Sequence, residues 1–325
     1  HATSSPREES PDRMRYALMT EPQQGYGYQD ILDAANAAKA AGFDTFFRSD
    51  HYSSFPGEEG LPATDCWTTL AGLARDTEGI GLGSMVSPVT FRIPGSYAKV
   101  VATVIDMAGG TTIEMGMGAG WNEGEHSALG IPYPDTVERV DRMEEQLAIL
   151  KGLWDEPDGW SYEGEHWQVK ETLFRPRVPR PNIIVGGVGR PRSCRLGAQY
   201  ADEYNISSSN PAEVREINAR LDAACEKLGR DSQTLTRSVM AGVLVGRSEF
   251  DFSERRRRQV AIFGGDVDGA EQWLEERKER WVTGTPDEAR SMISAYVETG
   301  IDRLLFQDFL PQDLDHVAVM GEIIS

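Results

Sequence analysis

The segment TTIEMGMGAGWNEGE, residues 111–125, is the stretch from which the fold of this chain is best inferred. It starts as a β-type run over residues 111–115, and glycine then occupies every second position at Gly116, Gly118 and Gly120. Glycine tolerates positive φ and lets a ring or another backbone come close. The segment therefore suits a strand end that opens onto a ligand, although a single glycine-rich run also suits a bulge and a tight turn.

Similar strand ends recur along the chain and alternate with helical patterns. Short β-type runs occupy residues 14–20, 43–48, 79–86, 111–115, 181–185, 204–206, 238–245 and 301–307. Helical patterns follow at residues 28–41, 65–76, 94–107, 135–153, 191 onward, 211–228, 286–299 and 313–324. Eight strand–helix units imply parallel strands with right-handed crossovers. They predict one domain over residues 14–325, an α/β fold of the (β/α)8 TIM barrel type.

Two insertions interrupt this alternation. Residues 155–180 carry an aromatic hairpin signal around Gly164, which we interpret as a hairpin packed on the barrel rim rather than as a roof over a substrate. Residues 246–284 are polar and charged, and their pattern predicts a helical segment from residue 250 to residue 281.

The loops that follow the strands of a barrel share one face of the molecule. Glu21, His51 and residues 84–87, 121–125 and 186–189 all come after predicted strands, although they lie far apart in the sequence. The fold therefore predicts that these side chains gather around one cavity. This convergence is the main argument from the residues for an active site.

The overall charge limits the classes of partner. The 325 residues carry 33 Lys and Arg against 52 Asp and Glu, a net charge of −19, so binding to nucleic acid or to an anionic membrane is disfavoured. Cys66, Cys194 and Cys225 follow no metal-ligand spacing, so we predict no metal site and a cytoplasmic location with reduced thiols. Residues 1–13 lack the apolar centre of a signal peptide, and we expect a flexible leader there.

Several motifs together resemble one known superfamily. They are Ser49-Asp50-His51, Gly83-Ser84-Met85-Val86-Ser87-Pro88, Thr90-Phe91-Arg92-Ile93-Pro94, Gly116-Met117-Gly118-Ala119-Gly120-Trp121 with Glu125, Ile184-Val185-Gly186-Gly187-Val188-Gly189 with Ala201-Asp202, and Gly284-Thr285-Pro286-Asp287-Glu288. In this order they are similar to the luciferase-like monooxygenases, and most similar to the branch that uses coenzyme F420, a deazaflavin. The resemblance implies a barrel of the bacterial-luciferase type, an F420-dependent oxidoreductase that transfers a hydride to or from a small organic substrate, a homodimer, and an F420 or flavin reductase as a partner.

The resemblance also implies roles for particular residues. Glu21 and His51 match the pattern of F420-dependent sugar-phosphate and alcohol dehydrogenases, which makes them the candidate catalytic acid/base groups. Asp50 is a candidate for orienting the imidazole or contacting the cofactor, and it equally suits a cap on the following turn. Trp121 stands where the sugar-phosphate dehydrogenases carry a glutamate, so we do not predict sugar-phosphate oxidation and expect a flatter, more apolar pocket.

The predicted cofactor-binding residues come from three further strand ends. They are Ser84, Met85 and Val86, then Gly118, Ala119, Gly120 and Trp121, and finally Gly186, Gly187, Val188, Gly189 and Arg190. The superfamily often has a non-prolyl cis peptide behind the ring, which we place at Ser84-Met85. The last group precedes a helix that starts near Pro191, and unblocked N–H groups at a helix N-terminus suit a phosphate, although a plain strand–helix turn has the same pattern.

Two other functions remain open from the sequence. An FMN-dependent monooxygenase would use reduced flavin and oxygen on the same barrel, and Glu21 together with His51 favours F420 over FMN. A non-catalytic flavin-binding barrel would need neither of these two side chains.

Overall fold

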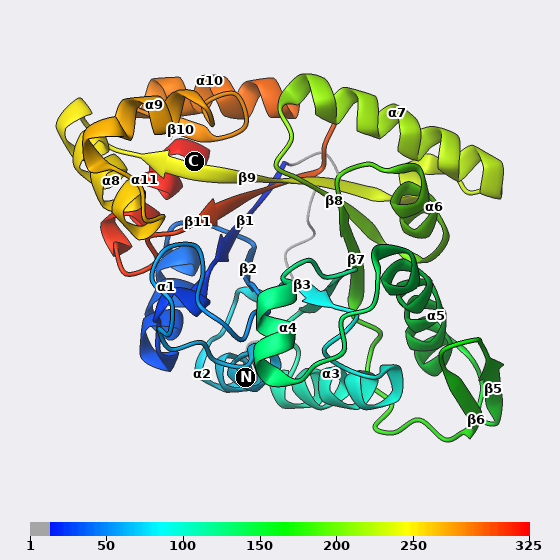
Figure 1. The fold of residues 1–325 in the computed structure, drawn as a ribbon. Helices are drawn as coiled ribbons and strands as arrows, with labels where there is room; N and C mark the ends of the chain where they lie inside the picture. The colour runs from blue at the N-terminus through cyan, green and yellow to red at the C-terminus, as the bar shows by residue number, and fades with distance from the viewer. Residues whose placement is uncertain (1–13) are drawn as a thin grey trace, which may run out of the picture.

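The computed structural model describes residues 14–325, so the leader predicted over residues 1–13 lies outside its described part. Eight parallel strands close into a barrel in the order β1-β2-β3-β4-β7-β8-β9-β11, with β11 pairing again with β1 (Figure 1). The strands are β1 (Arg15–Thr20), β2 (Thr45–Arg48), β3 (Gly81–Pro88), β4 (Ile113–Gly118), β7 (Asn182–Gly187), β8 (Glu203–Ser207), β9 (Thr236–Val245) and β11 (Arg303–Asp308). The predicted TIM barrel is confirmed.

Helices surround the barrel and connect its strands. They are α1 (Tyr28–Ala40), α2 (Cys66–Asp76), α3 (Pro94–Ala108), α4 (Glu123–Leu129), α5 (Thr136–Asp155), α6 (Pro191–Tyr200), α7 (Pro211–Leu228), α10 (Pro286–Val297) and α11 (Leu314–Ile324). Their starts are encoded locally: Asp65, Asn122, Asp135 and Asn210 each accept a hydrogen bond from the backbone N–H three residues on. Among residues 14–325, no helix is long and apolar enough to cross a membrane.

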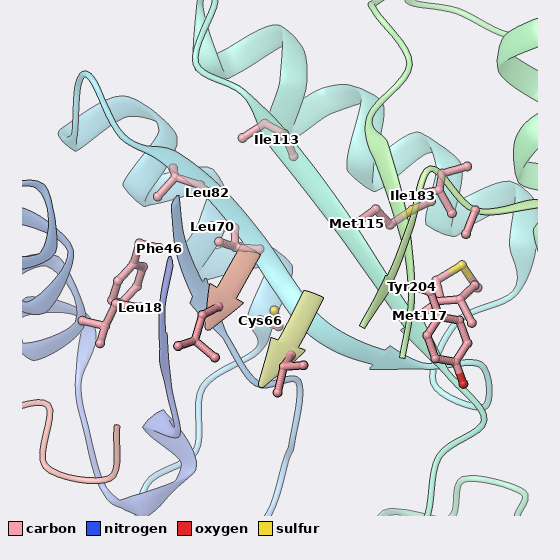
Figure 2. Close-up of a cluster of buried hydrophobic side chains, with 14 of the residues drawn as sticks. Leu18, Phe46, Cys66, Leu70, Leu82, Ile113, Met115, Met117, Ile183 and Tyr204 are labelled. Carbon is pink, nitrogen blue, oxygen red and sulfur yellow. The ribbon is translucent and has the colours of Figure 1, made fainter. Parts of the chain in front are cut away.

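The main hydrophobic core lies between the outer surface of the barrel and the helices. Figure 2 shows Leu18, Phe46, Leu82 and Ile113 from four neighbouring strands, together with Leu70 from α2. These side chains are almost fully buried. Burying a side chain of this size contributes about 1.5–3 kcal/mol, so this layer fixes the positions of the strand ends that carry the site.

The barrel interior is polar at its N-terminal end. Arg303 of β11 forms ion pairs with Glu114 of β4 at 2.7 Å and with Glu203 of β8 at 2.5 Å, and all three side chains are buried. Burial alone would raise the pKa of Glu114, but Arg303 and the hydrogen bonds from Asn182 and Thr45 outweigh it and lower this pKa to about 2. Buried charges persist only when they are paired and hydrogen-bonded in this way, so the cluster closes the base of the barrel.

Above this base the interior is apolar. The layer consists of Ala17, Met19, Phe47, Met85, Ile184 and Leu305. Arg303 lies 5.1 Å from the centroid of the Phe47 ring, which joins the polar base to the apolar layer. Beyond the layer the barrel opens at the C-terminal ends of its strands.

The first insertion forms the antiparallel hairpin β5 (Trp160–Glu163) and β6 (Gln168–Thr172). It lies beside α5 at the outer edge of the molecule, and the Trp160 ring packs on Gly152 of that helix (Figure 1). This location agrees with the interpretation of residues 155–180 as a hairpin packed on the barrel rather than a roof over the cavity.

The second insertion differs from the expected helical run over residues 250–281. It contains α8 (Glu249–Ile262), the short 3-10 helix Val267–Gly269, α9 (Ala270–Glu275) and a small strand, β10 (Val282–Gly284), that pairs with β9. The expected helical character is present in α8, the 3-10 helix and α9, but it is interrupted where Gly264, with a φ of 69°, follows the end of α8 and Asp266 caps a new turn.

Candidate active site

A cavity of about 980 Å³ opens at the C-terminal ends of the strands, where the sequence predicts the active site. Of the predicted residues, those that line it are Glu21, His51, Met85, Val86, Gly118, Ala119, Gly120, Trp121, Gly186, Gly187, Val188 and Arg190. Asp50, Ser84 and Gly189 do not line it. The strand ends thus bring together most of the residues that the sequence singles out.

His51 follows β2 and is held by a buried carboxylate. Its Nδ1 lies 2.9 Å from Oε1 of Glu125, whose other oxygen accepts the backbone N–H of Tyr52 at 3.0 Å. An ionised carboxylate only accepts hydrogen bonds, so Nδ1 carries the proton and Nε2 is left as the acceptor of the neutral ring. Within residues 14–325, Nε2 of His51 has no hydrogen-bond partner.

Two aromatic rings flank His51 at the cavity wall. The His51 ring meets Phe55 edge to face at a centroid distance of 4.4 Å and Trp121 at 5.8 Å, and the last two rings are 5.1 Å apart. Trp121 is 63% exposed, which is unusual for so large an apolar side chain and is explained by its position at the cavity mouth.

Glu21 follows β1 and is buried, with both carboxylate oxygens in use. Oε1 accepts from the side-chain amide of Gln307 at 2.6 Å, and Oε2 accepts from that of Gln23 at 2.7 Å. A carboxylate held by two neutral amides keeps a fixed orientation without a neutralising cation.

Asp50 has a different role from the one considered in the sequence. Its carboxylate accepts hydrogen bonds from Arg92 and from the Ser87 hydroxyl, and it is fully buried. The suggestion that Asp50 orients His51 is wrong, since Glu125 holds that position. Asp50 instead ties the β2 loop to Arg92, which also binds Asp65 at 2.7 Å.

A bulge in β3 projects Val86 into the cavity. The pairing of β3 with β4 shifts register between Ser84 and Ser87, and the cis peptide is Met85-Val86, so its expected location at Ser84-Met85 is corrected by one residue. Ser84 itself is buried, and its hydroxyl donates to the carbonyl of Gly116. Because of the bulge, the side chains of Met85 and Val86 line the cavity and that of Ser84 does not.

The alternating glycines of β4 have a packing cause that the sequence does not reveal. A Cβ on Gly118 would lie 2.7 Å from Val86, and one on Gly116 would lie 2.3 Å from the Ser84 carbonyl oxygen. A Cβ on Gly186 of β7 would lie 3.0 Å from the same Val86 side chain. The glycines therefore make room for the bulge.

The loop after β7 forms the opposite wall. Gly186, Gly187, Val188 and Arg190 line the cavity just before α6, whereas the N–H of Gly189 donates to the Tyr204 hydroxyl at 3.1 Å. A Cβ on Gly187 would lie 2.5 Å from the same hydroxyl, so backbone stays exposed there.

Arginine side chains gather on this same wall. Arg190 is exposed, and Arg192 is paired with Asp141 and Glu144. Arg139 of α5 is buried, and its Nε has no hydrogen-bond partner within residues 14–325. An orphaned buried guanidinium nitrogen and a glycine loop at a helix N-terminus are chemically suited to an anion.

Sequence reasoning missed several lining residues. They include Gln23, Phe55, Arg139, Asn205, Met240, Trp281, Gln307 and Phe309. Trp281 and Phe309 stack at 5.7 Å with an interplanar angle of 6°; Trp281 lies at the end of the polar, charged insertion, and Phe309 directly follows β11. These residues reach the site only because the fold brings distant segments together, and local sequence patterns do not contain that information.

The sequence matches a known family over most of its length. Residues 13–303 match the Luciferase-like monooxygenase family. The chain belongs to this family. One relative, an F420-dependent glucose-6-phosphate dehydrogenase from Microbacterium testaceum, is 27% identical over 314 residues, which cover 91% of each chain. An FMNH2-dependent dimethylsulfone monooxygenase from Pseudomonas putida is 26% identical over 245 residues and 65% of each chain.

The family fold is also seen in solved structures. One of them is the structure of an F420-dependent secondary alcohol dehydrogenase in complex with an F420-acetone adduct. It aligns with a TM-score of 0.80 at 18% identity, over 96% of this chain and 98% of that chain. At this identity the likeness establishes the shared fold.

Proposed function

We propose that this chain is an F420-dependent oxidoreductase that transfers a hydride between the deazaflavin and a small organic substrate. The observation that carries the proposal is that one cavity has acid/base side chains on one wall and groups suited to an anion on another. His51 and Glu21 follow β2 and β1, while the glycine loop with Arg190 and Arg192 follows β7, which lies across the barrel in the strand order. One wall thus suits proton transfer and the other suits a phosphate.

The residues present fit F420. The volume of about 980 Å³ is sufficient for a tricyclic ring, its phosphate-bearing chain and a small substrate. Gly186, Gly187 and Arg190 would hold the phosphate, with Arg139 as a further donor, and Val86 would support the ring face. When bound, F420 supplies a ring whose C5 accepts or donates a hydride.

The protein's own residues handle the accompanying proton. In the direction of oxidation, Nε2 of His51 takes the substrate hydroxyl proton, and in the reverse direction it returns that proton to the carbonyl oxygen. Glu125 fixes the proton on Nδ1 and so keeps Nε2 in the accepting form. Glu21, held by Gln23 and Gln307, is the second proposed acid/base group.

An FMN-dependent monooxygenase is the second candidate, because the family includes an FMNH2-dependent relative. Such an enzyme would bind FMN in preference to F420 and consume oxygen. The arrangement of His51 with Glu125 favours F420, since hydride exchange with an alcohol or ketone requires a matched proton transfer. A non-catalytic flavin-binding barrel would not require this pair.

Titration with oxidised F420, followed by absorbance and fluorescence, is the direct test. Saturable binding at micromolar F420, weaker binding of FMN and no oxygen uptake are expected. Binding of FMN alone would replace the proposal with the second candidate. His51→Ala and Glu21→Ala separate catalysis from binding, since both are expected to abolish turnover and retain F420 binding. Unchanged behaviour of both variants would favour the non-catalytic barrel.

Three further expectations accompany the proposed function. We expect a homodimer, a reductase that regenerates the cofactor, and a cytoplasmic location, all by analogy with the resemblance described above. Light scattering of the purified protein measures the first of these.

A further inference from the structure

We infer that the substrate of this site is an uncharged, apolar alcohol or ketone, of aromatic or alicyclic type, and not a phosphorylated sugar. The inference rests on the proposed function. If the phosphate of F420 binds at the wall that carries the arginines and the glycine loop, the space around His51 is left for the substrate. The inferred substrate class differs from that named for the relative, a glucose-6-phosphate dehydrogenase.

The first observation is the distribution of positive charge. Among the described residues that line the cavity, the arginines are Arg139, Arg190 and Arg192, and all lie on α5 or at the start of α6. Within residues 14–325, no lysine or other arginine lines the cavity, and the loops after β1 and β2 bring Glu21 and His51, the latter hydrogen-bonded to the carboxylate of Glu125. A phosphate dianion beside His51 would meet two negative groups and no cation.

The second observation is the chemistry of the walls around Nε2. Phe55 and Trp121 contact the His51 ring from two directions, and Pro56 and Met19 also line the cavity. Trp121 is 63% exposed and presents a flat apolar ring to the cavity beside the imidazole. Apolar surfaces on two sides of the imidazole favour an apolar substituent on the reacting carbon over a hydroxyl-bearing sugar carbon.

The third observation is a second aromatic group on the same side. Trp281 and Phe309 line the cavity and stack on each other, and Phe263 of the second insertion packs on Phe309 at 4.9 Å. The insertion approaches the Phe55 loop, since a Cβ on Gly57 would lie 1.9 Å from the carbonyl oxygen of Ile262. The β2 loop and the second insertion therefore lie against each other, and both contribute to an aromatic wall of the cavity formed by Phe55, Trp121, Trp281 and Phe309.

The proposed step balances. Oxidation of a secondary alcohol breaks the C–H bond at the carbinol carbon and the O–H bond and forms a C=O bond. Bound F420 would supply the hydride acceptor for the C–H bond, and Nε2 of His51 takes the proton of the O–H bond. Reduction of the ketone reverses these transfers. No other oxidant or reductant is needed.

Binding to the protein without cofactor is the first experiment. Saturation-transfer NMR compares three probes, 1-phenylethanol, glucose and glucose 6-phosphate. Saturable transfer to 1-phenylethanol is expected, with none to the other two. Glucose separates polarity from charge, because it has the hydroxyls without the phosphate. Equal or stronger transfer to glucose 6-phosphate would overturn the inference.

Matched variants locate the binding. Trp121→Ala and Phe55→Leu are each expected to weaken 1-phenylethanol binding by roughly tenfold. Phe250→Ala is the control, since Phe250 of α8 is 74% exposed and does not line the cavity. Trp121 is itself largely exposed, so its replacement leaves the core intact. Loss of affinity in Phe250→Ala alone, or in no variant, would count against the aromatic wall.

Turnover with F420 completes the test. Production of acetophenone from 1-phenylethanol is expected, with kcat/KM for glucose 6-phosphate at least about a hundredfold lower, since unpartnered polar groups are discriminated by such factors. If F420 does not bind and 1-phenylethanol does, the proposed function fails and the substrate class stands. If F420 binds and only glucose 6-phosphate is oxidised, the substrate class fails and the proposed function stands.

Discussion

Glu125 accepts two hydrogen bonds at once, one from Nδ1 of His51 at 2.9 Å and one from the backbone N–H of Tyr52 at 3.0 Å. The backbone donor fixes the carboxylate, and the carboxylate fixes the ring. Glu125 is therefore a positioning residue that reaches the reaction through His51.

Glu125→Gln tests this relationship. Glutamine offers one acceptor oxygen where two donors compete, so either Tyr52 N–H loses its partner or the His51 ring changes tautomer. We expect kcat to fall roughly tenfold to a thousandfold, within the range of general acid–base contributions, while the Kd for F420 changes little. The 15N chemical shifts of the His51 ring report the tautomer directly. A variant with wild-type shifts and wild-type kcat would show that the carboxylate does not position the ring.

Arg190→Gln tests the anion site. Arg190 is exposed at the cavity edge, and no ion pair holds it within residues 14–325, so it is available for a ligand phosphate. We expect the binding free energy of F420 to weaken by about 1.5–3 kcal/mol, typical of a hydrogen bond to a charged group, and its salt dependence to weaken. Arg257→Gln on α8 is the control because Arg257 is also exposed and does not line the cavity. Equal losses in both variants would point to a general charge effect.

Gly187→Ala tests the exposed backbone of the same loop. The new Cβ would lie 2.5 Å from the Tyr204 hydroxyl, which also accepts the N–H of Gly189, so the loop must shift. Overpacking of this kind costs about 1–3 kcal/mol of stability, and we expect F420 affinity to fall with it. Gly95→Ala is the matched control, since nothing lies within 4 Å of its Cβ. Thermal unfolding with and without F420 measures both effects, and a Gly187→Ala protein with unchanged affinity would contradict the assigned cradle.

Arg303→Met tests the polar base of the barrel. Removing the cation leaves the carboxylates of Glu114 and Glu203 buried together, which we expect to lower the free energy of unfolding by about 3–5 kcal/mol at neutral pH. Arg257→Met, an exposed replacement, should change it by less than about 1 kcal/mol. Urea unfolding followed by circular dichroism measures both values.

The pH dependence of this variant has a definite sign. In the wild type the pKa of Glu114 is lowered to about 2, so its contribution is fully present above the unfolded value of about 4.3 and is lost as the pH falls toward 2. Without Arg303, burial raises the pKa of Glu114, and protonation then favours the folded state. The difference between wild type and variant should shrink as the pH falls below about 5. A difference that stays constant from pH 7 to pH 4 would argue against the ion pairs.

The eight-unit alternation and the positions of the strand ends were predictable from the sequence because each unit carries its own strand pattern, cap and turn. Glu21, His51 and the Gly186 loop were found for the same reason. What local patterns do not contain is pairing between distant residues. The choice of Glu125 over Asp50 as the partner of His51 depends on α4 lying beside the β2 loop, and the role of the β4 glycines depends on a bulge in the neighbouring strand. The stacked Trp281 and Phe309 come from two segments that meet only in three dimensions.

The buried ion pairs of Arg303 with Glu114 and Glu203 close the base of the barrel, so within residues 14–325 we expect ligands to enter the cavity from the C-terminal ends of the strands. The ligand that binds deeper in the cavity is therefore expected to bind before the second ligand and to dissociate after it. We expect the kinetics to follow an ordered mechanism, with the order of binding and release set by the shape of the barrel. Product-inhibition patterns measured against each substrate would reveal this order.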